Sequence, residues 1–257
     1  MDTPRVSVAK LDDGQWWRVT IGGSTGNILD AAAMAALCQV MTAAQRDPVL
    51  KAIILEGEGD HFSFGASVQE HLPAGVESML GAFSHLLLTV LDSAVVLLAA
   101  IRGRCLGGGL ELVTLAHRVF ASRDAKLGQP EISLGVFAPA ASVLLPTRIG
   151  RANAEDLCLT GRIVGAAEAH ALGLVDEVVD AQPAEAALVW ARTHLASKSA
   201  SSLRHAIRAI RFDLTNRLTT DLPAIERLYL DELMQTADAV EGLNAFLEKR
   251  TPQWMNR

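Results

Sequence analysis

Apolar and polar positions alternate in two distinct ways along the first two thirds of the chain. Val6–Leu11 and Trp16–Ile21 have the pattern of strands, and Asp12-Asp-Gly-Gln between them is typical of a hairpin turn. Helix-like and strand-like segments then follow one another. We expect helices over Ala31–Arg46, Gly75–Leu91 and Gly108–Ala116, and strands over Ala52–Glu56, Ala94–Ile101 and Arg118–Ala121. This order predicts an α/β fold whose sheet has substantial parallel pairing and is covered by helices.

Beyond Gly150 the pattern becomes mainly helical. One more strand is expected over Leu174–Val179, and helices over Ala184–Ala196, Ser201–Arg217 and Leu222–Lys249. Breaks are expected at Ser199–Ser202 and at Asp221-Leu-Pro, and both are too short to be independent linkers. We therefore expect an α/β core over residues 1–197, followed by a helical region over residues 198–257.

Composition narrows the class of protein. The chain has 257 residues, half of them hydrophobic, and a net charge of −6 without a basic cluster, so we expect no nucleic-acid partner. Three distant cysteines and seven histidines without metal-ligand spacing predict neither a disulfide framework nor a metal site. The N-terminal Met1–Val6 lacks the features of a signal peptide, and Leu86–Ile101 is too short to span a membrane. A soluble cytoplasmic protein is the expectation.

Two glycine-rich segments follow expected strands, where α/β proteins place their ligands. The first is Gly57–Ser67, whose Phe62 and Phe64 suggest that the segment packs inward. The second is Gly107-Gly-Gly-Leu-Glu111, which opens an expected helix, so that unpaired backbone N–H groups face an approaching anion. Each also fits an ordinary role, as a surface turn or as close helix–strand packing. Glu131, twenty residues after Glu111, fits either a second acid of the site or a solvated loop.

Three motifs in order resemble a known family. Gly-x-x-x-x-Phe-Ser-x-Gly-Ala at 57–66, Gly-Gly-Gly-x-Glu-Leu at 107–112 and Gly-Gln-Pro-Glu-Ile-x-Leu-Gly at 128–135 are similar to those of the crotonase, or enoyl-CoA hydratase/isomerase, superfamily. The resemblance covers nearly the whole chain. It implies a spiral core of ββα units, and a C-terminal helical region that covers the active site and forms a homotrimer or a dimer of trimers.

The resemblance also implies a mechanism. The backbone N–H groups of Ala66 and Gly108 are expected to form an oxyanion hole for the thioester oxygen of an acyl-CoA substrate, with Glu111 and Glu131 moving protons. No cofactor is expected beyond the coenzyme A that the substrate carries. The remaining residues expected to bind substrate are Phe64, Ser67, Val68, Gly107, Pro130, Leu134 and Phe137.

Departures from the family pattern indicate a more specific substrate. His61–Pro73 and Gly135–Ser142 are most similar to hydratases of anaerobic benzoyl-CoA breakdown, which convert cyclohexa-1,5-diene-1-carbonyl-CoA into 6-hydroxycyclohex-1-ene-1-carbonyl-CoA. Phe137, Ala138 and Ala140 are expected to line an apolar slot for the planar ring. The usual Pro-Lys-x-x-Asn-Ala-Leu loop, which helps hold adenine in relatives, is replaced by Ser24–Asp30.

Other functions remain open at this level. A general straight-chain enoyl-CoA hydratase/isomerase would share every motif, and a non-catalytic CoA-binding scaffold would share the fold. Gly22-Gly-Ser24-Thr-Gly26 formally matches the nucleophile motif of a serine esterase, although such short motifs arise readily in turns. His61 and His71 flank the first glycine-rich loop, where they fit either substrate contacts or solvated loop positions.

Overall fold

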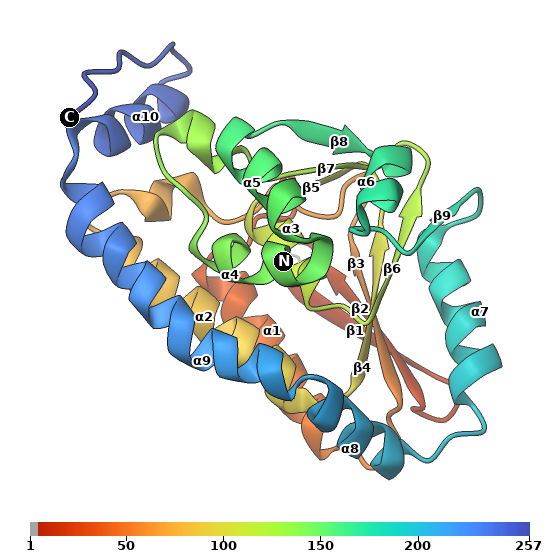
Figure 1. The fold of residues 1–257 in the computed structure, drawn as a ribbon. Helices are drawn as coiled ribbons and strands as arrows, with labels where there is room; N and C mark the ends of the chain where they lie inside the picture. Colours follow the sequence, from red (N-terminus) through yellow and green to blue (C-terminus); the bar gives the residue numbers. More distant parts are fainter. Residues whose placement is uncertain (1–4) are drawn as a thin grey trace.

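The computed structural model describes residues 5–257, so residues 1–4 of the expected core lie outside the described part. Its main sheet has six strands in the order β1-β2-β3-β4-β6-β9 (Figure 1). Only the β1–β2 hairpin pair is antiparallel, and the other neighbours run parallel, as the alternating pattern predicts. The strands are β1 Val6–Leu11, β2 Trp16–Ile21, β3 Ala52–Gly57, β4 Val96–Ile101, β6 Arg118–Ser122 and β9 Glu177–Val179.

Helices cover both faces of this sheet, because the strands bury their side chains alternately on the two sides. Trp17 and Ile53 face one core with helices α1 (Ala31–Arg46) and α2 (Val76–Ser93). Their neighbours Trp16 and Ile54 face a second, smaller core, which α7 (Pro183–Leu195) and α8 (Ala200–Ile210) complete. Figure 1 shows α7 alone on one side of the strands and α1 and α2 on the other.

A second, three-stranded sheet was not predicted. It has the order β5-β7-β8 and consists of Arg104–Leu106, Lys126–Gly128 and Ile163–Gly165. Each strand has only three residues, too few for a two-residue period to stand out from the surrounding loop. The statement that strands after Gly150 occur only at Leu174–Val179 was therefore wrong. Three further helices were not predicted: α4 (Pro139–Ile149), which ends before Gly150, and α5 (Arg151–Thr160) and α6 (Ala166–Leu172), which follow it.

The C-terminal third is mainly helical as expected, but its helix bounds differ from the prediction. The expected helix Ser201–Arg217 is divided at Arg211, and the expected helix Leu222–Lys249 is interrupted by turns at 228–235. The break at Ser199–Ser202 separates α7 (Pro183–Leu195) from α8 (Ala200–Ile210). In contrast, the break expected at Asp221-Leu-Pro is absent, because α9 (Phe212–Arg227) runs through Pro223. An internal proline costs a helix about 3 kcal/mol, and burial of Leu218 and Leu222 against the core opposes that cost. A π-helical turn, Leu228–Glu232, a 3₁₀ turn, Leu233–Gln235, and α10 (Ala237–Leu247) follow.

The remaining short elements carry the glycine-rich motifs. Helix α3 is Gly108–Thr114, and 3₁₀ turns span Val68–His71 and Pro130–Leu134. The loops between β3 and α2, between β5 and α3, and after β7 meet at one end of the two sheets. Within residues 5–257, no helix is long and apolar enough to cross a membrane.

Candidate active site

The loop that carries Ala66 is held in place from both sides. On one side, the Phe64 N–H donates to the Gly26 carbonyl at 2.8 Å, and the Leu29 N–H donates to the Gly65 carbonyl at 2.9 Å. On the other, the Leu106 N–H donates to the Ser63 carbonyl at 3.0 Å. This bonding fixes the direction of the Ala66 N–H, because the backbone on each side of it is tied to a neighbouring segment.

Asn27 adds a further constraint from the preceding loop. Its side-chain amide donates to the carbonyls of Glu58 and His61 at 2.9 and 2.8 Å, and its own carbonyl accepts from the Ser63 hydroxyl at 2.8 Å. Asn27 is 4% exposed and has a φ of +51°, a left-handed conformation that asparagine tolerates better than most residues. The changed loop 24–30 therefore has a structural role in shaping the first glycine-rich segment.

The triple glycine allows two backbone segments to meet. Gly107 has a φ of +50°, and a Cβ atom placed there would lie 2.5 Å from a carboxyl oxygen of Glu131. A Cβ on Gly108 would lie 3.2 Å from the Ala66 nitrogen, so the start of α3 and the Ala66 amide are close neighbours. Side chains at these positions would fill the space in front of the amides, which explains why glycines occupy them.

Neither of these two N–H groups has an acceptor within residues 5–257. Gly108 is the first residue of α3, where N–H groups have no intrahelical partner, and Ala66 makes no backbone or side-chain hydrogen bond through its nitrogen. Two adjacent, unpaired backbone donors form a suitable pair for an oxygen that gains negative charge. The geometry therefore fits the expected oxyanion hole of Ala66 and Gly108.

Glu111 is anchored by the start of another helix. It follows Gly108 on α3, is 5% exposed, and its Oε1 accepts the Ala141 N–H at 2.6 Å. Ala141 lies in the first turn of α4, whose positive dipole end favours a carboxylate. Burial raises the pKa of Glu111 above its ordinary value, while the N–H groups of Ala141 and Ala140 partly oppose that shift.

Glu131 lies next to Gly107, and its carboxyl lacks the N–H donors that Glu111 has. Its Oε2 is fully buried and has no hydrogen-bond partner in the described part of the chain. Burial raises the pKa of Glu131, and the negative charge of nearby Glu111 raises it further. Two buried carboxyls of the same charge share a proton more readily than they ionise together. The pair is thus suited to hold one proton between two sites.

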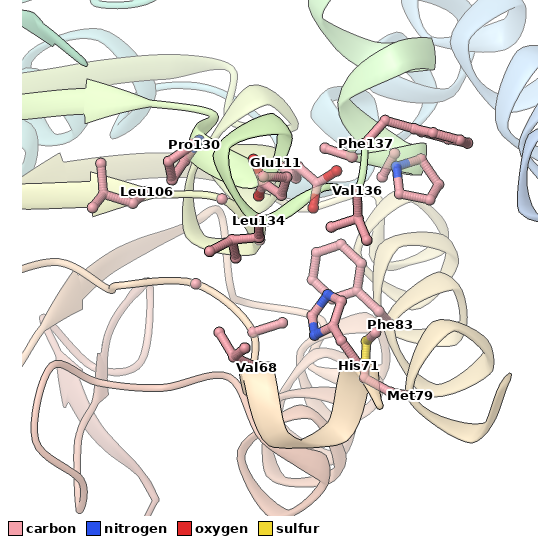
Figure 2. Close-up of a pocket in the computed structure, with 18 of the residues that line it drawn as sticks. Val68, His71, Met79, Phe83, Leu106, Glu111, Pro130, Leu134, Val136 and Phe137 are labelled. Carbon is pink, nitrogen blue, oxygen red and sulfur yellow. The ribbon is translucent and has the colours of Figure 1, made fainter. Parts of the chain in front are cut away.

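Both glutamates open into a cavity of about 450 Å³. Figure 2 shows Glu111 at one wall, with Leu134, Val136 and Phe137 beside it and Phe83 and His71 facing them. Most of the lining is apolar, which lowers the local dielectric and strengthens the electrostatic effect of the few polar groups. The cavity therefore combines the paired amides, the paired carboxyls and an apolar chamber.

The structure brings almost all of the expected residues to this cavity. Its lining includes Ala66, Gly108, Glu111, Glu131, Phe64, Val68, Gly107, Pro130, Leu134 and Phe137. Ser67 is the exception: it precedes the turn Val68–His71 and its carbonyl accepts from the His71 ring at 2.8 Å, so its contribution is to that turn rather than to the cavity wall. The inward packing expected of both phenylalanines holds for Phe62, whereas Phe64 is 39% exposed at the rim.

The structure also resolves the open alternatives for three polar residues. His71 lines the cavity and burial lowers its pKa, whereas the His61 ring accepts the Arg104 N–H at 3.2 Å beside the rim. The Ser24 hydroxyl accepts the Ile28 N–H at 2.9 Å within a turn. Ser24 is therefore part of an ordinary turn and not placed as an esterase nucleophile, since it does not line the cavity. No group of three potential metal-ligating side chains occurs within residues 5–257.

Several residues of the cavity were missed by sequence reasoning. Helix α2 contributes Met79, Leu80, Phe83 and Ser84, and the C-terminal region contributes Leu222, Glu226 and Phe246. The Ser84 hydroxyl donates to Glu226, which joins α2 to α9 at the cavity wall. No local motif marks these residues, because their apolar pattern is that of any core-facing helix and the Ser84–Glu226 pair spans 142 positions.

Fold and site together define a class of enzyme. Paired backbone N–H groups beside two protonatable carboxyls stabilise an enolate-like oxygen and move protons to and from neighbouring atoms.

Comparison with known proteins identifies the family. The model of the family described as enoyl-CoA hydratase/isomerase matches residues 19–257. A cyclohexa-1,5-dienecarbonyl-CoA hydratase of Thauera aromatica is 51% identical, over 95% of this chain and 95% of that protein. A probable enoyl-CoA hydratase of Rhizobium meliloti is 34% identical, over 90% of each chain. The crystal structure of an enoyl-CoA hydratase from Mycobacterium avium subsp. paratuberculosis superposes with a TM-score of 0.84, at 26% identity over 98% of this chain and 99% of that one.

The chain therefore belongs to the enoyl-CoA hydratase/isomerase family. The expected crotonase-like fold is confirmed, and the protein is an enzyme of the hydro-lyase type.

Proposed function

We propose that the protein adds water to cyclohexa-1,5-diene-1-carbonyl-CoA and forms 6-hydroxycyclohex-1-ene-1-carbonyl-CoA. The observation that carries this proposal is the pair of buried carboxyls, Glu111 and Glu131, beside the unpaired amides of Ala66 and Gly108. The 51% identical relative from Thauera aromatica, named for this substrate, supports the choice of acyl group.

The environments of the two glutamates assign them different roles. Glu111 receives N–H donors from the start of α4, which stabilise its charged form, so it is the base that takes a proton from water. Glu131 has a buried oxygen without a partner and is repelled by the charge of Glu111, which favours its neutral form. It is therefore the acid that delivers a proton to carbon.

The bonds formed follow from the chemistry of the thioester. Water oxygen bonds to the ring carbon β to the carbonyl while Glu111 takes its proton, and the electron pair moves onto the oxygen held by Ala66 and Gly108. The second double bond extends this enolate to the far side of the ring. The product keeps a double bond conjugated with the thioester, so the proton from Glu131 must add at that far carbon. One water is consumed, and no electrons are gained or lost.

The shape of the cavity supports a ring rather than a flexible chain. Phe137, Ala138 and Ala140 line the cavity that holds the carboxyls. Figure 2 shows Phe83 across the cavity from Phe137. The two alanines are small and buried, so they take up little of the space beside Phe137 that a planar ring would need. A planar ring fills such a slot with little loss of conformational freedom, whereas an extended chain must be ordered on binding. A general straight-chain hydratase is the alternative function that shares the carboxyl pair.

Product analysis with the purified enzyme tests the proposal. We expect conversion of cyclohexa-1,5-diene-1-carbonyl-CoA to an adduct heavier by one water, at a kcat/KM well above that for crotonyl-CoA. In deuterium oxide, NMR should place one deuterium on the ring carbon opposite the hydroxylated one. A preference for crotonyl-CoA would contradict the ring substrate and favour a general straight-chain hydratase. The absence of turnover with both substrates would favour the non-catalytic CoA-binding scaffold.

The pH dependence of kcat/KM is a second prediction. The active form holds one proton on the pair, and the pKa of each carboxyl is raised above the ordinary 4.5. A second proton neutralises the base on the acid side, and loss of the last proton removes the acid on the alkaline side. We therefore expect a bell-shaped profile with both limbs above pH 4.5. An acid limb at or below pH 4.5, measured at constant ionic strength, would contradict the raised pKa values that burial and charge repulsion give the two glutamates.

We further propose a cytoplasmic homotrimer or dimer of trimers that uses no cofactor beyond coenzyme A in its substrate. The hydration is redox-neutral, and Cys38, Cys105 and Cys158 are free thiols, which suits a reducing compartment. In the C-terminal region 198–257, Ile210 and Phe212 are 82% and 69% exposed, and such exposed apolar side chains support a subunit interface. The same region supplies Leu222, Glu226 and Phe246 to the cavity, in agreement with the expected cover.

A further inference from the structure

Tyr229 is a buried polar residue that the mechanism above does not use. It is the single tyrosine of the sequence and is 0% exposed. Its hydroxyl is fully buried and has no hydrogen-bond partner in residues 5–257. A buried hydroxyl without a partner costs about 1–3 kcal/mol, so its retention in a core calls for an explanation.

Tyr229 packs behind a residue of the active-site cavity. It lies in the π-helical turn Leu228–Glu232, where α9 widens before the chain turns towards α10. Such turns occur frequently at functional sites. Its ring packs edge-on against Phe137, with centroids 5.2 Å apart, and Phe137 lines the cavity beside the glutamates. Tyr229 thus lies directly behind one wall of the proposed ring slot.

The hydroxyl is also within electrostatic reach of both catalytic acids. Burial raises the pKa of Tyr229, and the charges of Glu131 and Glu111 raise it further. The phenol therefore stays protonated and remains a hydrogen-bond donor throughout the working range. Glu131 Oε2 is the complementary group, because it is an acceptor that is equally buried and equally without a partner.

We propose that Tyr229 is a positioning residue for Glu131, and that its hydroxyl donates through one bound water to the buried Glu131 Oε2. One water between the two groups satisfies a buried donor and a buried acceptor at once. The link fixes the orientation of the Glu131 carboxyl towards the substrate. It also makes Glu131 a stronger acid, because a donor stabilises the charged form of a carboxyl more than the neutral form. This inference rests on the proposed acid role of Glu131.

Other titratable groups near the site do not account for the same effect. The pKa of the Cys158 thiol is raised to about 12 by burial and by the charges of Glu131 and Glu111, so this thiol stays neutral. Glu226 is hydrogen-bonded to Ser84, and His71 is bonded to the Ser67 carbonyl. Arg104 lies at the rim beside Phe64. Among the neighbouring charged groups, Glu111 is therefore the one whose charge raises the pKa of Glu131 in the described site.

Tyr229→Phe tests the proposal, because it removes the hydroxyl and keeps the ring against Phe137. With whichever enoyl-CoA the wild type hydrates, we expect kcat to fall about tenfold, the loss for one hydrogen bond of about 1.4 kcal/mol. KM should change by less than about twofold, since the substrate does not touch the hydroxyl. The alkaline limb of the pH profile should move to higher pH, because Glu131 becomes a weaker acid. An unchanged kcat and alkaline limb would overturn the proposal.

A double-mutant cycle separates positioning from packing. On the Glu131→Gln background, Tyr229→Phe should cost no further activity, because the acid through which it acts is already absent. An equal loss on both backgrounds would show an independent structural effect and overturn the link to Glu131.

A third readout needs no turnover, so it remains informative even if the proposed substrate is wrong. Incorporated 3-fluorotyrosine places one ¹⁹F label at position 229, since the chain has no other tyrosine. We expect its resonance to follow the titration of the carboxyl pair in the wild type and to lose that step in Glu131→Gln. A resonance that does not shift when the carboxyl pair titrates, or that shows the same shift in Glu131→Gln, would contradict the proposed link.

Discussion

Replacing either Glu111 or Glu131 by glutamine is expected to lower kcat for hydration by about 10²–10⁴-fold, the usual contribution of a positioned general acid or base. Glutamine keeps the size of the side chain and removes the ability to exchange a proton. The two variants should also differ. Glu111→Gln leaves an acid without a base, so it loses the acid limb of the pH profile, whereas Glu131→Gln loses the alkaline limb. Stopped-time assays of thioester conjugation measure both.

The stability of these variants provides an internal check on the activity result. A carboxyl whose pKa is raised on folding favours the folded state below its unfolded pKa, and that advantage is lost as the pH rises through the folded pKa. Removing a buried charge should therefore leave the melting temperature at neutral pH unchanged or higher. Glu77→Gln, at an exposed position of α2, is the matched control and should retain full activity. Loss of folding in Glu111→Gln or Glu131→Gln would contradict the proposed burial cost.

Gly108→Ala is expected to lower kcat/KM by about 10²–10³-fold, the cost of losing one oxyanion donor. The φ of Gly108 lies outside the left-handed region, so alanine fits the backbone. However, the new methyl would lie 3.2 Å from the Ala66 nitrogen and 3.5 Å from the Phe83 ring, where the thioester oxygen is expected. The substrate carbonyl would then be displaced from both amides. Kinetics with the substrate that the wild type prefers measure the effect.

Gly81→Ala is the matched control for this change. Gly81 lies in the middle of α2, and a Cβ atom there has nothing within 4 Å. Alanine at that position should keep activity and raise the free energy of unfolding by about 0.5–1 kcal/mol, because it reduces the freedom of the unfolded chain. Wild-type activity in Gly108→Ala would exclude the Gly108 amide as an oxyanion donor.

The sequence predicted the larger elements of the fold because their patterns are local. The hairpin, α1 and the parallel strands β3, β4 and β6 are each long enough for a pattern to be visible. The three-residue β9 was found as the end of the longer apolar run Leu174–Val179. The second sheet was missed because strands such as Lys126–Gly128 are three residues long and form only through distant partners. At Pro223 a break was predicted that the structure does not have, because burial of Leu218 and Leu222 outweighs the helix-breaking tendency of proline.

The residues of the site also fall into those that the sequence could predict and those that it could not. Ala66, Gly108, Glu111 and Glu131 could be predicted because glycine-rich turns and acids keep fixed spacing within short motifs. Phe83, Glu226 and Tyr229 could not, because their roles depend on how α2 and the C-terminal helices cross the cavity. A buried phenol in a helical region has the same sequence pattern as any core residue. Only the absence of a partner for its hydroxyl in the folded, described chain marks it as unusual.

The cavity draws on two separate stretches of chain, and this has an evolutionary consequence. The paired amides and both glutamates lie between Ala66 and Glu131, whereas Leu222, Glu226 and Phe246 come from the last sixth of the chain. As long as Tyr229 is kept, substitutions at Leu222 and Phe246 can reshape the chamber without changing the residues that move protons. A duplicated gene for such an enzyme can therefore acquire a new acyl preference while its catalytic step is inherited intact.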